Sequence, residues 1–577
     1  MPRIDFSRKI IFLLPIILIT GFFLRVWGIG FGLPYQFHQD EPIVVNHALA
    51  YGMGNFNPGF FAIPPLVSYL LFFVYGVMFF VGSIFGSWHG SEEFAVKFFQ
   101  DPSIFYLAGR FFLGVIPGTV AIFLTYRLSS RFISEKAALY AAAIMAFCFL
   151  NVINSHYIYT DMVLTVVILF AYERMYAIFK SPTIWNYFVA GFFVGLAAGV
   201  KYNGIILFVP YLWVHLSFAG GADRKWLLLS GKFWCGIFSA LAAFIIVNPF
   251  ALLDWQGFLT SFIAQSGAFS PTGWFHHIKY SLFEGISFPL TVLGFIGIMF
   301  FLFDRNKWHK AVVFFPIALY LVLVFKSQHF SRYVLFLVPF FAMGAGYILF
   351  DKLSAAAIRF WSGRIVVCIA VMLIVPTFLK SVKADILFSS PDTRVTAAHW
   401  MRENLTEGTK IACDSTIFRP AVKQPYSQLV DKKGYVLGQE DVEGSVVRKL
   451  DYMIKTADPD KKGYPLYFLY ENPEVQGKFL NTLPAIPYDL DKLAELNIKY
   501  ICVNGQSSSP STGAFIESLG LRGEVVAEFS PYKDGKFRMT GDKIALTCMS
   551  VTDEEVFSRV VPGPSLRIYK VLVENEK

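Results

Sequence analysis

Twelve long apolar segments lie in the first 388 residues, and they constrain the fold of this chain more than any other feature. They cover roughly residues 10–30, 64–85, 104–126, 137–153, 162–179, 186–200, 203–219, 233–251, 288–303, 311–325, 333–350 and 364–380. A helix that crosses a bilayer needs about 20 mostly apolar residues. Only 16% of the chain is charged, against about 25% in a typical soluble protein. We therefore expect a polytopic α-helical membrane protein, and a disordered chain, a coiled coil and a small disulfide scaffold are excluded.

The charges divide the chain into two parts. The first 389 residues contain 26 basic and 15 acidic side chains, a balance of +11, whereas the remaining residues contain 24 and 26, a balance of −2. The overall charge of +9 therefore belongs to the apolar part, where nucleic-acid binding is not expected. We predict a transmembrane domain over residues 1–388 and a soluble α/β domain over residues 389–577.

The basic residues between the apolar segments indicate how the chain is threaded through the membrane. Cytoplasmic loops carry an excess of Lys and Arg. Six basic clusters, with 17 of the 26 basic residues, all fall on the cytoplasmic side if segment 64–85 does not cross. We therefore expect about eleven spans, with 64–85 forming a re-entrant or interfacial helix on the outer face. The N-terminus, whose first apolar run we interpret as an uncleaved anchor, is then inside, and the C-terminal domain is outside.

The C-terminal part alternates helix-like and strand-like patterns. Pro391–Leu405 is amphipathic with capping residues at its ends, which predicts a helix. Ser507–Gly513 is typical of a surface loop, and the sequence does not define any pairing among Cys413, Cys502 and Cys548. Short strands are expected at Lys410–Cys413, Pro465–Leu469, Ile498–Val503, Glu524–Phe529 and Leu566–Val571.

Two adjacent acids, Asp40 and Glu41, follow the first span on the expected outer face, with His38 before them and Pro42 after them. Pro42 suits the first turn of a helix and Asp40 suits its cap, so one interpretation is an N-cap beside a solvated Glu41. The other is a general base, a carboxylate that takes a proton from an acceptor hydroxyl as it attacks. Ionisable groups close to a bilayer are costly, which favours a functional role.

A short loop that ends at Asp161 joins the third and fourth expected spans and also contains His156. Asp161 could cap the helix from Met162 onward. Alternatively, it orients a sugar, supports the base, or helps to hold a metal with His156. A His–Asp pair alone is weak support for a metal, because metal sites need three or more converging ligands.

Basic residues also mark the expected outer face. Lys201 interrupts a long apolar run at the tip of a helical hairpin, and Arg332, just after His329, opens a span at its outer end. Snorkelling towards lipid headgroups is one explanation for Lys201 and Arg332. The other is a clamp on a phosphate, because Arg presents a fork of donors and Lys a point charge. His329 is a candidate for the same role, and Arg25 and Arg110 are weaker candidates.

These motifs, in their order and on their shared membrane face, resemble those of the GT-C superfamily of membrane glycosyltransferases. More narrowly, they resemble the branch that holds the protein O-mannosyltransferases and lipid A aminoarabinose transferases. The matching features are Asp40-Glu41, Pro64-Pro65, Ser155-His156 followed by Asp161, Gly199-Val200-Lys201-Tyr202-Asn203, and His329 before Arg332-Tyr333 and the Pro339-containing span. The start of the tail, Asp392-Thr393-Arg394 with Trp400 and Glu403-Asn404, is similar to bacterial members.

The resemblance implies transfer of a sugar from a polyprenyl-phosphate carrier to a hydroxyl acceptor, with inversion at C1, at the outer face of a bacterial inner or plasma membrane. It implies that Asp40 is the base, with Glu41 as its neighbour, and that Asp161 is the second-loop acid. Lys201, His329 and Arg332 would lie near the carrier phosphate. The sugar, the acceptor (lipid, glycan or protein) and any divalent metal stay open. Secondary candidates are Arg25, His38, Arg110, His156, Tyr202 and Tyr333.

Two other classes of protein are alternatives. A lipid or sugar transporter, or a flippase, is expected to show inverted repeats and ionisable groups at the bilayer midplane. We find no repeat, and the charges gather at one face. A non-catalytic membrane scaffold would use the acids only as helix caps. A measurement of sugar transfer separates these classes from an enzyme.

Overall fold

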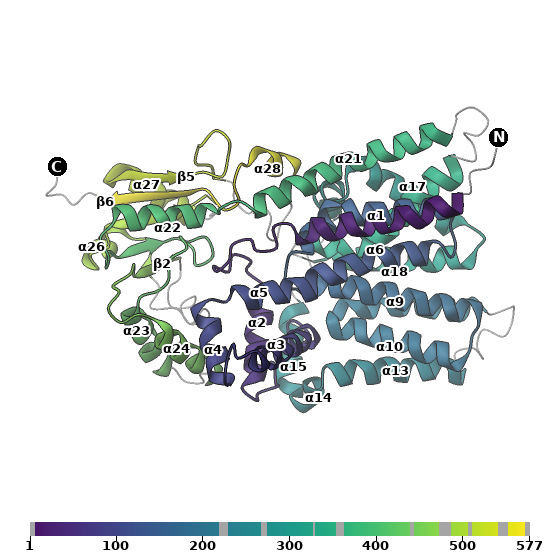
Figure 1. The fold of residues 1–577 in the computed structure, drawn as a ribbon, viewed down its shortest axis with the longest axis horizontal. Helices are drawn as coiled ribbons and strands as arrows, with labels where there is room; N and C mark the ends of the chain where they lie inside the picture. Colours follow the sequence, from purple (N-terminus) through teal and green to yellow (C-terminus); the bar gives the residue numbers. More distant parts are fainter. Residues whose placement is uncertain are drawn as a thin grey trace.

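The fold was established from a computed structural model of the chain. The structure describes residues 6–218, 229–266, 274–326, 329–353, 363–438, 444–471, 486–505, 510–539 and 552–571. Figure 1 shows a bundle of long helices at one end of the molecule and a sheet with its covering helices at the other.

Each of the twelve predicted apolar segments coincides with a helical element. These are α1 (Phe6–Val26), α3 (Leu66–Ile84), α5–η1–α6 (Ser103–Ser129), α7 (Glu135–Phe147) with α8 (Phe149–Asn154), α9 (Thr160–Lys180), α10 (Ile184–Val200), η2–α11 (Tyr202–Leu216), α13 (Gly231–Val247), α17 (Phe288–Phe303), α18 (Lys307–Val324), η6–α19–η7 (Ser331–Leu353) and α21 (Gly363–Phe388). Within the described residues, six helices are long and apolar enough to cross a membrane, or seven if one bent pair forms a single span. The chain is therefore an integral membrane protein.

The segment expected not to cross, α3, packs against α2 (Glu41–Gly52) and precedes α4 (Ser91–Gln100). Its length and composition would permit a span. Figure 1 draws α3 strongly foreshortened at the end of the bundle, whereas α6, α9, α10 and α13 run lengthwise. Val67, Leu71 and Tyr75 are buried, while the opposite face exposes large apolar side chains that include Phe73 and Phe80. An exposed apolar face of this kind suits contact with lipid.

Small residues bring α10 and α13 into close contact. A Cβ atom built on Gly191 would lie 1.9 Å from the carbonyl oxygen of Gly236, and one on Gly195 would lie 1.9 Å from that of Ala240. Close backbone approach through small residues is a common way for membrane helices to pack. This packing fixes the end of α10, where Lys201 follows directly.

The C-terminal part of the chain contains a six-stranded sheet in the order β3-β2-β1-β4-β6-β5. Strands β3, β2, β1 and β4 run parallel to one another, and β6 is antiparallel to both β4 and β5. All five predicted strands are present, and the short β3 was not predicted. The strands are β1 (Ile411–Cys413), β2 (Leu466–Tyr470), β3 (Ile486–Pro487), β4 (Tyr500–Asn504), β5 (Gly523–Phe529) and β6 (Leu566–Val571).

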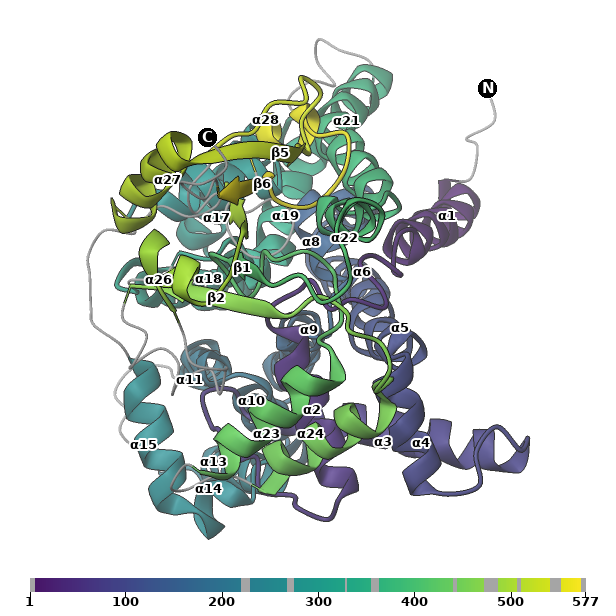
Figure 2. The same cartoon turned by 90° about the vertical axis from the view of Figure 1, so that its left-hand side faces the viewer.

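Helices accompany the sheet, and two views show them on its sides (Figures 1 and 2). The helix predicted at Pro391–Leu405 is α22 (Thr393–Asn404), and the side chain of Asp392 caps it by accepting from the N–H of Arg394. The remaining helices were not predicted. They are α23 (Tyr426–Leu437), α24 (Gly444–Thr456), α26 (Leu490–Glu495), α27 (Pro510–Arg522) and α28 (Asp553–Ser558).

Contacts on α21 and the chain that follows it join the bundle to the sheet region. The amine of Lys380 on α21 lies 2.6 Å from a carboxylate oxygen of Asp553 on α28 and 3.1 Å from one of Glu284. The guanidinium of Arg394 on α22 stacks 3.6 Å from the ring centre of Phe37, which lies just before α2. Arg394 thus connects the C-terminal part of the chain to the loop that follows α1.

Two smaller expectations concern the C-terminal part. The loop predicted at Ser507–Gly513 is wrong from Pro510 onward, because α27 begins there, and residues 506–509 lie outside the described residues. Cys413 and Cys502 are buried free thiols that face each other in the register of β1 and β4. Cys548 lies outside the described residues.

Asp414, which follows β1, makes the stability of the sheet depend on pH. Burial raises the pKa of Asp414 to about 7, although hydrogen bonds from Asn504 act in the opposite direction. A carboxyl group whose pKa is raised in the folded state stabilises the fold below pH 3.8 and loses that contribution as the pH rises through about 7. We expect the thermal midpoint of the full chain to fall between pH 5 and pH 8, and to fall less in Asp414→Asn. The exposed Asp458→Asn is the control, and equal pH dependence in all three proteins would contradict this prediction.

Candidate active site

Asp40 lies at the N-cap position of α2, but its side chain makes no capping hydrogen bond. Instead, one carboxylate oxygen lies 2.7 Å from Nη1 of Arg332 in η6 (Ser331–Leu337). The position of a helix cap was predicted correctly, and Pro42 does lie in the first turn. The carboxylate itself is directed to a cation that lies far away in the sequence.

Asp161 lies in the first turn of α9, whose N-cap residue is Tyr159. The interpretation of Asp161 as the helix cap is therefore wrong. One of its carboxylate oxygens accepts a 2.7 Å hydrogen bond from Nζ of Lys201, and the other lies 3.8 Å from Nε of Arg332. Asp161 thus stands between two cations.

These contacts form a chain of alternating charges, Asp40–Arg332–Asp161–Lys201, which we call the charge relay cluster. Its members come from the starts of α2, η6 and α9 and from the residue after α10. The two inner side chains are 9% (Arg332) and 3% (Asp161) exposed, whereas the end members are 16% (Asp40) and 19% (Lys201) exposed. Both ends of the cluster are therefore the more accessible to an incoming molecule.

Lys201 adopts an extended backbone conformation between α10 and η2. Its amine lies 5.3 Å from the ring centre of Tyr333 and 5.7 Å from that of Tyr159. Burial lowers the pKa of Lys201, and the neighbouring Asp161 opposes this shift. A lysine that is directed to a buried acid and to aromatic faces is not snorkelling to headgroups, so that alternative is wrong for Lys201.

His329 belongs to a cluster of three histidines that its sequence motif did not predict. The ring of His276 lies 4.7 Å from that of His329, and the ring of His277 lies 5.6 Å from it. Burial lowers the pKa of His276, and the neighbouring His329 acts in the same direction. The ring of His277 is also 6.5 Å from that of Tyr333, which connects the histidines to the surroundings of Lys201.

Glu41 is separate from the charge relay cluster. It is fully buried, and both of its carboxylate oxygens accept 2.8 Å hydrogen bonds from Arg110. Glu41 also accepts from the N–H of Ile158, while Arg110 donates to the carbonyl oxygens of Ile29 and Phe31. The interpretation of Glu41 as a solvated side chain is therefore wrong. The pair ties together the loop after α1 and the loop before α9.

The remaining secondary candidates also bond to the protein itself. Arg25 donates to the carbonyl oxygens of residues 21, 145 and 146, and the two ring nitrogens of His156 lie 2.9 Å from the carbonyl oxygens of residues 27 and 152. The ring of His38 lies 4.2 Å from that of Tyr157, and the hydroxyl of Tyr202 donates to the carbonyl oxygen of Phe61. Through these contacts, the four side chains hold the loops around the site in place.

A metal centre has no ligand set in the part of the chain that the structure describes. There, no group of three His, Cys, Asp or Glu side chains is placed to hold a metal ion. His156 and Asp161, the pair considered from the sequence, bond instead to backbone carbonyl oxygens and to cations.

The buried pair of Glu41 and Arg110 gives a stability prediction. In Glu41→Ala the guanidinium of Arg110 stays buried without its counterion, which we expect to cost about 3–5 kcal/mol of unfolding free energy. A lower thermal midpoint of the purified full chain measures this loss. Replacing both partners, as Glu41→Leu with Arg110→Met, is expected to restore much of it, and the exposed Glu93→Ala serves as the control. A midpoint unchanged in Glu41→Ala would contradict the assignment.

Comparisons with known proteins agree with the resemblance predicted above. Residues 106–250, which include Asp161 and Lys201, match the family model described as dolichyl-phosphate-mannose-protein mannosyltransferase. No curated protein matches the chain. Among solved structures, ArnT from Cupriavidus metallidurans in the apo state is 13% identical, with 90% of this chain and 96% of that chain covered and a TM-score of 0.48. The Archaeoglobus fulgidus oligosaccharyltransferase tethered with an acceptor peptide is 14% identical, with 88% and 70% covered and a TM-score of 0.47.

The matched segment begins in α5 and ends in α14 (Phe250–Leu253), and it thus contains α9 and α10, which carry two members of the charge relay cluster. Over residues 106–250 this match agrees with the resemblance to membrane mannosyltransferases that the sequence predicts.

Proposed function

We propose that this protein is an integral-membrane glycosyltransferase that moves a sugar from a polyprenyl-phosphate carrier to a hydroxyl acceptor at the outer face of the membrane. The observation that carries the proposal is the charge relay cluster, which brings two acids and two cations together from four distant segments. The mannosyltransferase family match over residues 106–250 supports the same reaction class.

The cations supply a binding site for the carrier phosphate. Arg332 offers a planar fork of donors and Lys201 a point charge, and both already face carboxylates, which are anions like phosphate. A phosphate that binds both cations alongside Asp161 replaces Asp40 as the partner of Arg332. His329 and the neighbouring His276 lie beside His277, whose ring is 6.5 Å from that of Tyr333, and they are candidates for further donors to the phosphate.

Once Arg332 pairs with the phosphate, its ion pair with Asp40 is broken. The carboxylate of Asp40 is then available as a base. The acceptor hydroxyl oxygen attacks C1 of the sugar while the C1–O bond to the phosphate breaks, and C1 is inverted. The bonding electrons leave with the phosphate, whose charge Arg332 and Lys201 stabilise. The hydroxyl proton passes to Asp40, so the products are the glycosylated acceptor, polyprenyl phosphate and a protonated Asp40. In this scheme Asp161 keeps the two cations in place between turnovers.

In the proposed topology, all members of the charge relay cluster lie on the outer side of the membrane. We infer eleven spans, α3 lying at the outer interface, a transmembrane domain over residues 1–388 and a soluble extracytoplasmic domain over residues 389–577. The positive-inside rule supports this arrangement, because six basic clusters then share the cytoplasmic side. Figure 1 supports it as well, since α2 and α3 lie at the end of the bundle that faces the sheet.

Replacing Asp40 tests the role of the base. Asp40→Asn keeps the size of the side chain but cannot take up the proton, so we expect the rate of transfer to fall by about 10²–10⁴-fold. The rate is measured with a polyprenyl-phosphate sugar in proteoliposomes that contain the purified protein. Asp101→Asn, in an exposed loop of the same region, is the matched control.

The thermal midpoint of Asp40→Asn shows that the variant is folded. Transfer at the rate of the unchanged protein would remove Asp40 from the role of base. Absence of transfer by the unchanged protein, with any polyprenyl-phosphate sugar, would instead favour a transporter or a scaffold.

Replacing Arg332 tests the phosphate clamp. Arg332→Ala is expected to raise the KM for the donor by about tenfold or more, since a charge-assisted bond contributes about 1.5–3 kcal/mol. The KM for the acceptor should change much less. Arg332→Lys retains the charge without the planar fork and should recover part of the loss. A defect confined to the acceptor would contradict the clamp.

A further inference from the structure

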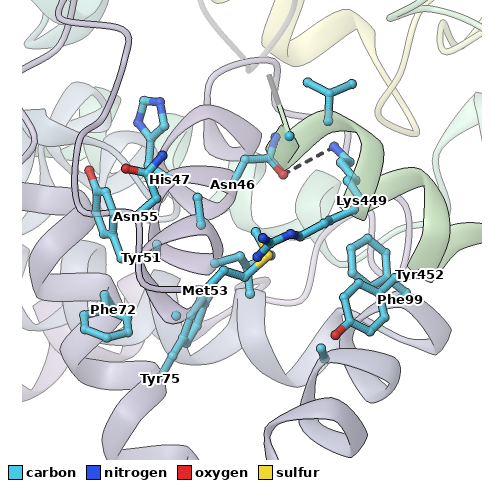
Figure 3. Close-up of a pocket in the computed structure, with 18 of the residues that line it drawn as sticks. Asn46, His47, Tyr51, Met53, Asn55, Phe72, Tyr75, Phe99, Lys449 and Tyr452 are labelled. Atoms are coloured by element: carbon cyan, nitrogen blue, oxygen red, sulfur yellow. Dashed lines mark hydrogen bonds between the residues drawn. The ribbon is translucent and has the colours of Figure 1, made fainter. Parts of the chain in front are cut away.

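A cavity lined in part by α2 takes no part in the mechanism above. It has a volume of about 1110 Å³ and lies between α2, α3 and α4 on one side and α23 and α24 on the other. Figure 3 shows Asn46, His47 and Tyr51 of α2 on one side and Lys449 and Tyr452 of α24 on the other, with Asn46 hydrogen-bonded to Lys449. The sequence does not predict this cavity, because its two walls are about 400 residues apart in the chain.

One wall of the cavity is apolar and belongs to the interfacial helices. Phe72, Tyr75 and Phe79 of α3 and Phe94 and Phe99 of α4 line it. Gly76 lies among them, and a Cβ atom added there would meet no atom within 4 Å. The apolar wall therefore encloses open space next to a helix that exposes its opposite face to lipid.

The other wall is basic. Lys432 of α23 and Arg448 and Lys449 of α24 line the cavity. Among the residues that the structure describes, no acid lines the cavity. Burial lowers the pKa of Lys432 to about 8, with the neighbouring cations Lys449 and Arg419 acting in the same direction. A bound anion would relieve this repulsion.

Three contacts hold the two walls together. Nζ of Lys449 donates to the side-chain oxygen of Asn46 (3.3 Å), and the rings of Phe99 and Tyr452 stack with their centres 5.4 Å apart. Lys455 of α24 also pairs with Glu92 of α4. These contacts connect α24 directly to α2 and α4, and they keep the two walls of the cavity in place.

The cavity is also close to the proposed base. Asn46 lies six residues after Asp40 on α2, which places it about 9 Å along the helix axis, given a rise of 1.5 Å per residue. A molecule anchored in the cavity by one group can therefore present another group near Asp40. Neither Lys201 nor Arg332 lines the cavity, so it is distinct from the proposed phosphate clamp.

We propose that this cavity binds the acceptor, and that the acceptor is an anionic lipid whose acidic headgroup lies against Lys432, Arg448 and Lys449 and whose apolar part lies against α3 and α4. That the bound molecule is the acceptor rests on the proposed function. That it is an anionic lipid rests on the cavity alone. A small free anion would leave the aromatic wall unused. A peptide is less favoured, because the apolar wall belongs to helices placed at the membrane surface.

Photolabelling of the purified full chain in nanodiscs tests the binding without requiring transfer. The nanodiscs consist of phosphatidylcholine doped with a photoreactive phosphatidylglycerol, or with a photoreactive phosphatidylcholine as the neutral probe. The anionic probe is expected to label residues 46–60 and 444–453, and the neutral probe is not. Equal labelling of these segments by both probes would overturn the proposal.

Two variants examine the two walls separately. Lys432→Ala with Arg448→Ala and Lys449→Ala removes the cations, and Gly76→Leu fills the open space on the apolar side. Each is expected to reduce labelling by the anionic probe by about tenfold. Lys492→Ala and Gly520→Leu are matched controls outside the cavity. Thermal midpoints identify any variant that is unfolded, and the other variant then decides the test.

Competition distinguishes the sources of the anion. An excess of inorganic phosphate, or of a soluble hydroxyl-containing peptide, should leave the labelling unchanged. Displacement by phosphate would show a site for a free anion, and displacement by the peptide a site for a protein segment; either result overturns the proposal. In transfer assays the same variants should raise the KM for an anionic lipid acceptor and not that for the donor. Labelling as expected without transfer would retain the lipid site and reject the proposed function.

Discussion

The mutual neutralisation of Asp40, Arg332, Asp161 and Lys201 is the interaction on which the rest of this structure depends. Each charge alone would cost several kcal/mol in so enclosed a place, so the segments that carry them must converge. The close packing of α10 on α13 through Gly191 and Gly195 fixes the end of α10, and Lys201 with it. The result is a set of charges already oriented before any substrate arrives, and such preorganised charges are what stabilises a leaving phosphate.

The structure separates two kinds of buried charge that look alike in the sequence. Glu41 and Arg110 satisfy each other and the surrounding backbone completely, and both are fully enclosed. Asp40 and Lys201, by contrast, end a chain of charges on its more accessible sides. An enclosed pair can only hold loops together, whereas a pair with accessible ends can exchange a partner for a substrate. This difference is the physical basis for proposing roles for Asp40 and Lys201, and for assigning Glu41 to the support of the site.

The sequence predicts the twelve apolar helical segments, one helix of the C-terminal part and five of the six strands, because apolar runs and alternating patterns are local signals. The sequence also predicts that Asp40, Asp161, Lys201 and Arg332 lie at one face, because a charged residue between apolar spans has few positions open to it. It could not identify the partner of Glu41, since Arg110 lies 69 residues away, nor the position of Asp161 inside the first turn of α9. The histidines beside His329 and the basic wall of the cavity depend on tertiary contacts, and β3 has only two residues, too few for a pattern.

The two proposed sites share α2: its first residues adjoin the charge relay cluster, and its second half lines the cavity. A sugar donor and a lipid acceptor could thus approach Asp40 from different sides. The most direct test is a structure determined by electron cryo-microscopy with a non-transferable analogue of a polyprenyl-phosphate sugar. Our account predicts that the phosphate contacts Arg332 and Lys201, that C1 faces Asp40, and that Arg332 no longer bonds to Asp40. A phosphate bound elsewhere, with the bond between Asp40 and Arg332 intact, would contradict it.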